Sequence, residues 1–157
     1  GDREDAIQDI VGEYLITFDF ESNDRMSQTS IFLPPGYHDP GNLTLYYPVM
    51  YFLHGYGQEP NDLILSAIVF GNNMISDLIV QDDRMQKVIM VFPDGRCRFD
   101  DDALDSEKEC QKGSFYVNSK WDGPDEGPQM ESILLDLMDY IDATYRTKPE
   151  ETITYTY

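Results

Sequence analysis

Two short apolar runs stand out along the chain, and each ends in turn-forming residues. The first run, residues 47–53, ends in His54-Gly55-Tyr56-Gly57, and the second, residues 88–92, ends in Pro93-Asp94-Gly95. A short continuous apolar run bounded by turn residues predicts a strand buried on both faces, as in a parallel sheet. The amphipathic stretch between the runs is long enough for a crossover helix. The pattern therefore predicts a β-α-β unit with two adjacent or near-adjacent parallel strands.

The amino-terminal part of the chain alternates between apolar and polar positions. In residues 12–20 the apolar positions are Tyr14, Ile16, Phe18 and Phe20, which predicts a half-buried strand. Residues 27–33 predict a second strand, which Pro34 and Pro35 end. With the turn at 21–25 between them, we expect residues 13–33 to form an antiparallel hairpin at the sheet edge. The polar residues 1–12 are expected to be an arm or a short helix.

The remaining pattern predicts helices and one long loop. Asn61 can cap a helix that continues to Ile68, and residues 75–80 predict a second helical segment. The clearest helix follows Pro128, with apolar residues at helical spacing up to Tyr145, and Pro149 is expected to mark its end. Residues 95–128 form a long polar excursion, which is typical of functional or disordered loops. Residues 152–157 have the composition of a strand. The expected fold is α/β, with one domain and its parallel part over residues 47–149.

The charge of the chain excludes some classes of partner. The 157 residues carry 30 acidic and 11 basic side chains, a net charge of −19. Nucleic-acid binding needs a basic surface, and anionic membranes would repel this one, so neither partner is expected. No apolar run is long enough for a membrane-spanning helix. The acidic surface favours solubility, and adaptation to a saline habitat is an open alternative.

Two cysteines, Cys97 and Cys110, flank a polar acidic loop. A pair that closes one short loop predicts a disulfide in an oxidising compartment, hence a secreted or periplasmic protein, although two free thiols are the alternative. No Cys-x-x-Cys occurs and no metal site is predicted. Within the loop, residues 100–109 could offer oxygen ligands to calcium. Their spacing is not that of an EF-hand, so a solvated acidic loop is the favoured interpretation.

The Gly-rich turn after the first apolar run is the strongest candidate for chemistry. The backbone of Gly55, Tyr56 and Gly57 is expected to emerge at the carboxyl end of a sheet strand, where open α/β sheets bind their ligands. A turn of this kind can direct backbone N–H groups at a developing oxyanion. A His-Gly turn of this kind is typical of the oxyanion loop in α/β-hydrolase esterases. A plain strand-end turn that needs glycine is the structural alternative.

Five segments occur in the order found in one esterase family. They are residues 28–37 (QTSIFLPPGY), 48–57 (PVMYFLHGYG), 92–95 (FPDG), 113–119 (GSFYVNS) and 139–147 (DYIDATYRT). Together they resemble the amino-terminal half of the family that includes esterase D (S-formylglutathione hydrolase), feruloyl and acetyl-xylan esterases, and the mycobacterial mycolyltransferases. The resemblance covers roughly residues 28–149. It implies an α/β-hydrolase fold and a serine-type carboxylic ester hydrolase.

The resemblance also implies roles for individual residues. The backbone N–H of Tyr56 would donate one of the two oxyanion hydrogen bonds, and His54 would order the oxyanion loop without transferring protons. Phe115, Tyr116 and Trp121 would lie near the substrate cleft, with core packing as an equal alternative. Ser114 lacks the sharp elbow of a nucleophile, and His38 is expected at the surface.

The chain contains no Gly-x-Ser-x-Gly, the segment that carries the nucleophile in such enzymes. We therefore expect a fragment whose serine, acid and late histidine lie beyond residue 157. No metal or organic cofactor is implied. The expected substrate is a small-molecule or carbohydrate ester, and a complementary carboxyl-terminal fragment is a candidate partner. Acyl transfer of the mycolyltransferase type and a non-catalytic fragment that binds carbohydrate or protein are the alternatives.

Overall fold

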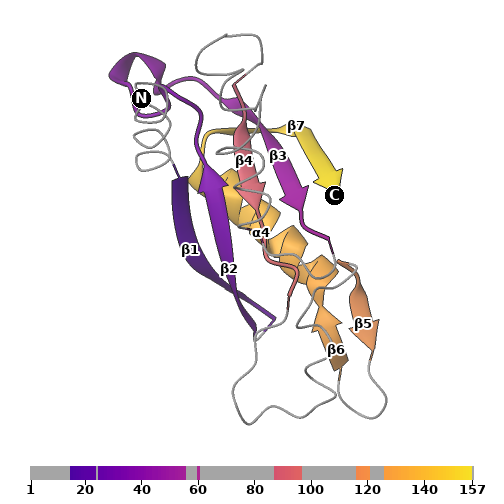
Figure 1. Ribbon diagram of the computed structural model, residues 1–157. Coiled ribbons are helices and arrows are strands. Elements are labelled where there is room, and N and C mark those ends of the chain that lie inside the picture. Colours follow the sequence, from indigo (N-terminus) through magenta and orange to yellow (C-terminus); the bar gives the residue numbers. More distant parts are fainter. Residues whose placement is uncertain are drawn as a thin grey trace, which may run out of the picture.

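The computed structural model describes residues 15–23, 25–55, 60, 87–96, 116–120 and 126–156. Figure 1 shows most of the described strands side by side, with one long helix crossing them. In chain order they are β1 (Leu15–Ser22), β2 (Arg25–Phe32), the 3₁₀ turn η1 (Pro40–Asn42), β3 (Tyr47–Leu53), β4 (Ile89–Phe92), β5 (Asn118–Lys120), β6 (Glu126–Gln129), α4 (Met130–Thr144) and β7 (Thr147–Thr156). The predicted arm at 1–12 and the predicted helices between residues 61 and 80 lie outside the described residues.

Five strands form one sheet in the order β1-β2-β4-β3-β7. The edge hairpin is antiparallel, with Leu15 opposite Phe32 and Ser22 opposite Arg25. β2 pairs antiparallel with β4, whereas β3 pairs parallel with both β4 and β7. The predicted hairpin and the predicted adjacent parallel strands are therefore confirmed.

The strand that follows α4 differs from the sequence prediction. The helix ends at Thr144, well before Pro149, and β7 begins at Thr147. Tyr47 pairs with Thr147, but Val49 already pairs with Thr152, so the intervening residues of β7 form an irregularity in the ladder. A proline cannot donate to a ladder and is tolerated at such a place. Pro149 therefore interrupts a strand, and the expectation that it ends the helix was wrong.

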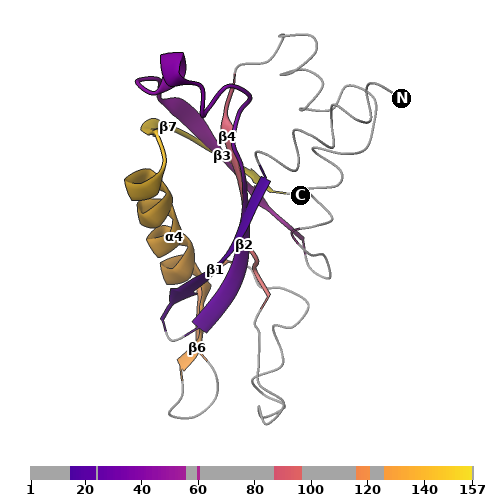
Figure 2. The same ribbon diagram turned by 90° about the vertical axis from the view of Figure 1, so that its left-hand side faces the viewer.

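Helix α4 covers one face of the sheet, as Figure 2 shows. Its buried side chains are Met130, Ile133, Leu137 and Ile141, which recur at helical spacing. β3 and β4 are almost completely buried, as their continuous apolar composition predicts, and together with α4 and the end of β2 they form the core. At the hairpin, Phe18 and Phe20 of β1 pack against Tyr140 of α4, with ring centroids 5.5 and 5.6 Å apart.

A side chain from β5 caps the amino terminus of α4. The helix has no cap from its own preceding residue, Gln129. Instead, the side-chain amide oxygen of Asn118 (Oδ1) accepts hydrogen bonds from the Ser132 backbone N–H (3.1 Å) and hydroxyl (3.3 Å). β5 and β6 form an antiparallel pair. The long excursion at 95–128, expected as a loop, thus contains a short strand pair that supports the helix.

Arg146 ties three segments together at the amino-terminal end of β3. Its guanidinium carbon lies 3.8 Å from the centroid of the Tyr37 ring, and its Nε donates to the Leu45 carbonyl at 3.0 Å. Its Nη2 also donates to the Tyr37 carbonyl, while its backbone N–H donates to the Tyr37 hydroxyl at 3.0 Å. One side chain therefore holds the loop after β2 against the turn between α4 and β7.

No helix within the described part of the chain has both the length and the apolar character needed to cross a membrane.

Candidate active site

The candidate site lies at the carboxyl ends of two neighbouring parallel strands. His54 and Gly55 follow β3, and Asp94, Gly95 and Arg96 follow β4. Because parallel strands end at the same edge of a sheet, the two turns meet there. Tyr116, which precedes β5, is the third contributor. His54 and Asp94 are each only 3% exposed, so their polar groups need partners inside the protein.

Both ring nitrogens of His54 are engaged with backbone groups. The Gly95 N–H donates to Nε2 at 2.8 Å, and Nδ1 lies 3.0 Å from the Gly55 carbonyl oxygen. Nε2 must therefore carry a lone pair, and the proton of the neutral ring lies on Nδ1, which donates to Gly55. A ring with both nitrogens committed cannot take up a substrate proton without losing one of these bonds. His54 thus orders the turn and is poorly placed to act as a general base.

Tyr116 closes over this turn. Its hydroxyl donates to the His54 carbonyl oxygen at 3.0 Å, and its ring meets the imidazole edge-on with centroids 6.0 Å apart. The ring also lies against Gly95, where an added Cβ would come within 2.6 Å of the tyrosine ring and hydroxyl. Any larger residue at position 95 would therefore require the Tyr116 ring to move. Tyr116 itself has a φ of 55°, an uncommon conformation for a residue other than glycine.

The buried Asp94 forms an ion pair with the partly exposed Arg96 beside the imidazole. The Arg96 backbone N–H and Nε both donate to Oδ1, at 2.9 and 3.0 Å, and Nη2 donates to Oδ2 at 2.9 Å. The Asp94 carboxylate also lies 3.4 Å from His54 Nε2. Burial raises the pKa of Asp94, but the hydrogen bonds from Arg96 and the charge of its guanidinium more than reverse this and hold the pKa well below its usual range. Asp94 is therefore a carboxylate at neutral pH.

Burial, together with the Asp94 charge, raises the pKa of the Tyr116 hydroxyl well above its usual range. The hydroxyl therefore stays protonated at any working pH. It can donate to the His54 carbonyl throughout.

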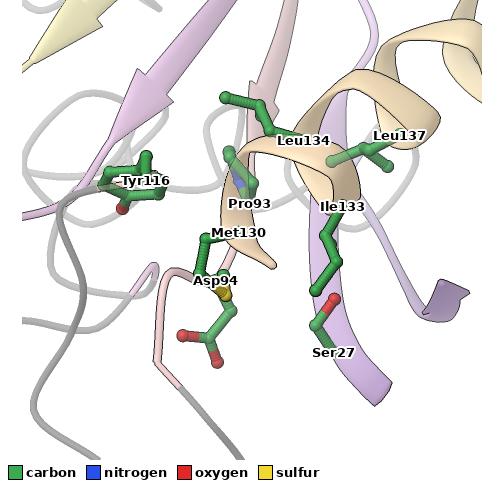
Figure 3. A pocket seen from close by; sticks show the side chains of 8 residues that line it. All are labelled: Ser27, Pro93, Asp94, Tyr116, Met130, Ile133, Leu134 and Leu137. Atoms are coloured by element: carbon green, nitrogen blue, oxygen red, sulfur yellow. The ribbon is translucent and has the colours of Figure 1, made fainter. Parts of the chain in front are cut away.

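A small pocket lies between this cluster and the first turns of α4. Figure 3 shows Met130, Ile133 and Leu134 of the helix close to Pro93 and Asp94, with Tyr116 beside them. Its volume of about 10 Å³ is room for one water molecule at most. The space beneath Asp94 is thus packed with apolar side chains. This packing shields the Asp94 carboxylate from solvent, and the pocket is too small for a substrate.

The structure brings together some of the residues that the sequence singled out. His54, Gly55 and Tyr116 meet at one point, and His38 is exposed, as expected. The oxyanion candidates Tyr56 and Gly57, the aromatic residues Phe115 and Trp121, both cysteines, Ser114 and the acidic residues 100–109 all lie outside the described residues. Within the described ranges no group of His, Cys, Asp and Glu side chains has the arrangement of a metal site.

Asp94, Gly95 and Arg96 were missed as site residues by the sequence analysis, which treated Pro93-Asp94-Gly95 only as a turn. A signal was present, since Asp94 directly follows a buried parallel strand, as His54 does. Polar residues in these two positions are expected at one sheet edge. No pattern in the sequence predicts the hydrogen bond between the Gly95 N–H and the His54 imidazole.

A mixed sheet with an antiparallel edge hairpin of β1 and β2, three parallel strands in the order β4-β3-β7 and a covering helix is part of an α/β-hydrolase fold. No protein-family model matches the chain, and no curated protein sequence matches it. Among solved structures, the chain is similar to an S-formylglutathione hydrolase from Agrobacterium tumefaciens, with a TM-score of 0.63 and 17% identity. It is also similar to a ferulic acid esterase from Anaeromyces mucronatus, with a TM-score of 0.56 and 19% identity.

These alignments cover 90% and 92% of the chain but only 47% and 49% of the two enzymes. An S-formylglutathione hydrolase from Staphylococcus aureus shows the same relation, with a TM-score of 0.51, 12% identity and 46% of its length covered. The chain thus spans about half the length of these structures. At such identities the likeness shows the fold, and at that level the family resemblance predicted from the sequence is confirmed.

Proposed function

We propose that this chain is the oxyanion-loop half of a serine-type carboxylic ester hydrolase. The observation that carries the proposal is the arrangement of the His54-Gly55 turn. It lies at the carboxyl end of β3, which β4 and β7 flank on both sides, and it is held by bonds from Gly95 and Tyr116. A rigid backbone turn in this place is what stabilisation of an oxyanion requires. The fold shared with esterases supports the same class of reaction.

In the proposed reaction, a serine hydroxyl attacks the ester carbonyl and the carbonyl oxygen becomes an oxyanion. The alcohol then leaves with a proton, and water hydrolyses the acyl-enzyme to release the acid. The turn after β3 supplies one oxyanion donor, the backbone N–H of Tyr56. The serine, its acid and its base are supplied from beyond residue 157, because no Gly-x-Ser-x-Gly occurs in the chain. No residue of this half has to exchange a proton with the substrate.

The test is ester hydrolysis by two versions of the protein. One is the 157-residue chain, and the other is extended through the reading frame that follows residue 157. With p-nitrophenyl acetate, the extended protein is expected to show saturable turnover that a serine-directed fluorophosphonate abolishes, while the shorter chain stays at background. An extended protein that is folded yet inactive on a panel of aryl, acetyl-sugar and thioester substrates would refute the proposal. Saturable turnover by the shorter chain would contradict the division of roles.

A further inference from the structure

The two carbonyl groups that precede Tyr56 both accept hydrogen bonds from buried side chains. His54 Nδ1 donates to the Gly55 carbonyl at 3.0 Å, and the Tyr116 hydroxyl donates to the His54 carbonyl at 3.0 Å. The Gly55 carbonyl belongs to the same peptide group as the N–H of residue 56. Because a peptide group is planar, fixing the direction of this carbonyl also fixes the direction of that N–H.

The donors are themselves held in place by the turn after β4. The Gly95 N–H donates to His54 Nε2 at 2.8 Å. The proton of the imidazole therefore lies on Nδ1, where it faces the Gly55 carbonyl. Tyr116 is confined between the His54 ring and Gly95, where even a methyl group would collide with it. Three segments that are distant in the sequence therefore converge on two successive peptide groups.

From this geometry we infer that Tyr116 is a positioning residue for the oxyanion hole, acting through the His54 carbonyl. This inference rests on the proposed function and extends it to a residue that does not touch the substrate. The hydroxyl of Tyr116 anchors the peptide group before Gly55, and His54 anchors the one after it. A donation to a carbonyl also polarises its peptide group, so the N–H of that same group becomes a better donor.

The positive φ of Tyr116 agrees with this role. A residue other than glycine is held in the left-handed region only where its surroundings determine the conformation, and such residues are concentrated at functional sites. The Tyr116 side chain is held by its hydrogen bond to the His54 carbonyl and by its packing against Gly95. The hydroxyl, which makes the bond to His54, is therefore the group to remove in a test.

Tyr116→Phe removes that hydroxyl and keeps the ring. The matched control is Tyr37→Phe, because the Tyr37 hydroxyl also makes a 3.0 Å bond to backbone, accepting from the Arg146 N–H at the opposite end of β3. In the extended enzyme we expect Tyr116→Phe to lower kcat on the order of tenfold with little change in KM, since misplaced groups cost rate rather than binding. Tyr37→Phe should lower Tm without changing kcat.

The 157-residue chain gives a second readout that needs no activity. Tyr116→Phe is expected to shift the backbone ¹³C resonance of the His54 carbonyl, and Tyr37→Phe to leave it unchanged. An active wild-type enzyme whose kcat survives Tyr116→Phe would overturn the inference and leave the proposed function standing. An unchanged His54 carbonyl resonance would overturn it as well. An inactive wild-type extended protein would refute the proposed function and the inference together.

Discussion

Replacing Asp94 by Asn tests the ion pair that supports the turn after β4. The carboxylate accepts three hydrogen bonds from Arg96 and is 3% exposed. Asn keeps the shape and one acceptor oxygen, but its amide N–H₂ cannot accept from Arg96 Nη2. Hydrogen bonds to a charged group contribute about 1.5–3 kcal/mol each. With one bond lost and the other two weakened, the free energy of unfolding should fall by about 2–3 kcal/mol at pH 7.

The effect should depend on pH, with a sign set by the lowered pKa of Asp94. A carboxyl group whose pKa is lower in the folded state than in the unfolded state stabilises the fold above the unfolded pKa, which is about 4. This contribution is lost progressively as the pH falls below that value. The difference in stability between wild type and Asp94→Asn should therefore be largest at neutral pH and shrink below about pH 4.

Urea unfolding of both proteins at a series of pH values measures this difference, provided that the m-values agree. Asp19→Asn on the exposed side of β1 is the control for the change in net charge and should shift stability by less than about 0.5 kcal/mol. Equal stability of wild type and Asp94→Asn at pH 7 would refute the reasoning. So would a difference that stays constant from pH 7 to pH 3.

Substitutions at three further positions test contacts that hold the fold together. Arg146→Lys should lower the free energy of unfolding in urea by about 2 kcal/mol. An ammonium group cannot replace both the bonds to the Tyr37 and Leu45 carbonyls and the stacking on the Tyr37 ring. A change below about 0.5 kcal/mol would argue that Arg146 does not hold these segments together. Thr29→Val should raise stability by about 1 kcal/mol, since the buried Thr29 hydroxyl has no hydrogen-bond partner among the described residues. A loss of stability would show that it has a partner. Asn118→Ala should cost about 1 kcal/mol by uncapping α4, whereas Asn118→Asp retains the acceptor and should stay near wild type. Equal losses in the two Asn118 variants would speak against capping.

The sequence was sufficient for the sheet because each strand carries its own burial pattern. β3 and β4 are continuous apolar runs, and β1 alternates, so their places in the centre and at the edge followed from composition. The start of β7 did not follow, because Pro149 and two glutamates obscure a strand that is held by its ladder with β3. At the start of β7, the pairing with β3 outweighs the local conformational preference of these residues.

For the site, the sequence pointed to His54, Gly55 and Tyr116 but not to the hydrogen bonds that join them to one another and to Gly95. The bond from the Gly95 N–H to His54 Nε2 joins residues 41 positions apart, and no local pattern encodes it. The same holds for Tyr116, whose hydroxyl reaches a carbonyl 62 positions away. Contacts of this kind depend on how two strand ends meet, which only the folded sheet determines.

The most direct measurement of the central claim is the turnover number of two Tyr56 variants in the extended enzyme. Tyr56→Phe keeps the backbone N–H and is expected to retain near-normal kcat. Tyr56→Pro removes the N–H and should lower kcat by roughly 10²–10³, the usual effect of one lost oxyanion donor. Circular dichroism and Tm must show that the Pro variant is folded, since proline can also distort a turn. A folded Tyr56→Pro enzyme with near-normal turnover would contradict the account, because the oxyanion would then be stabilised elsewhere.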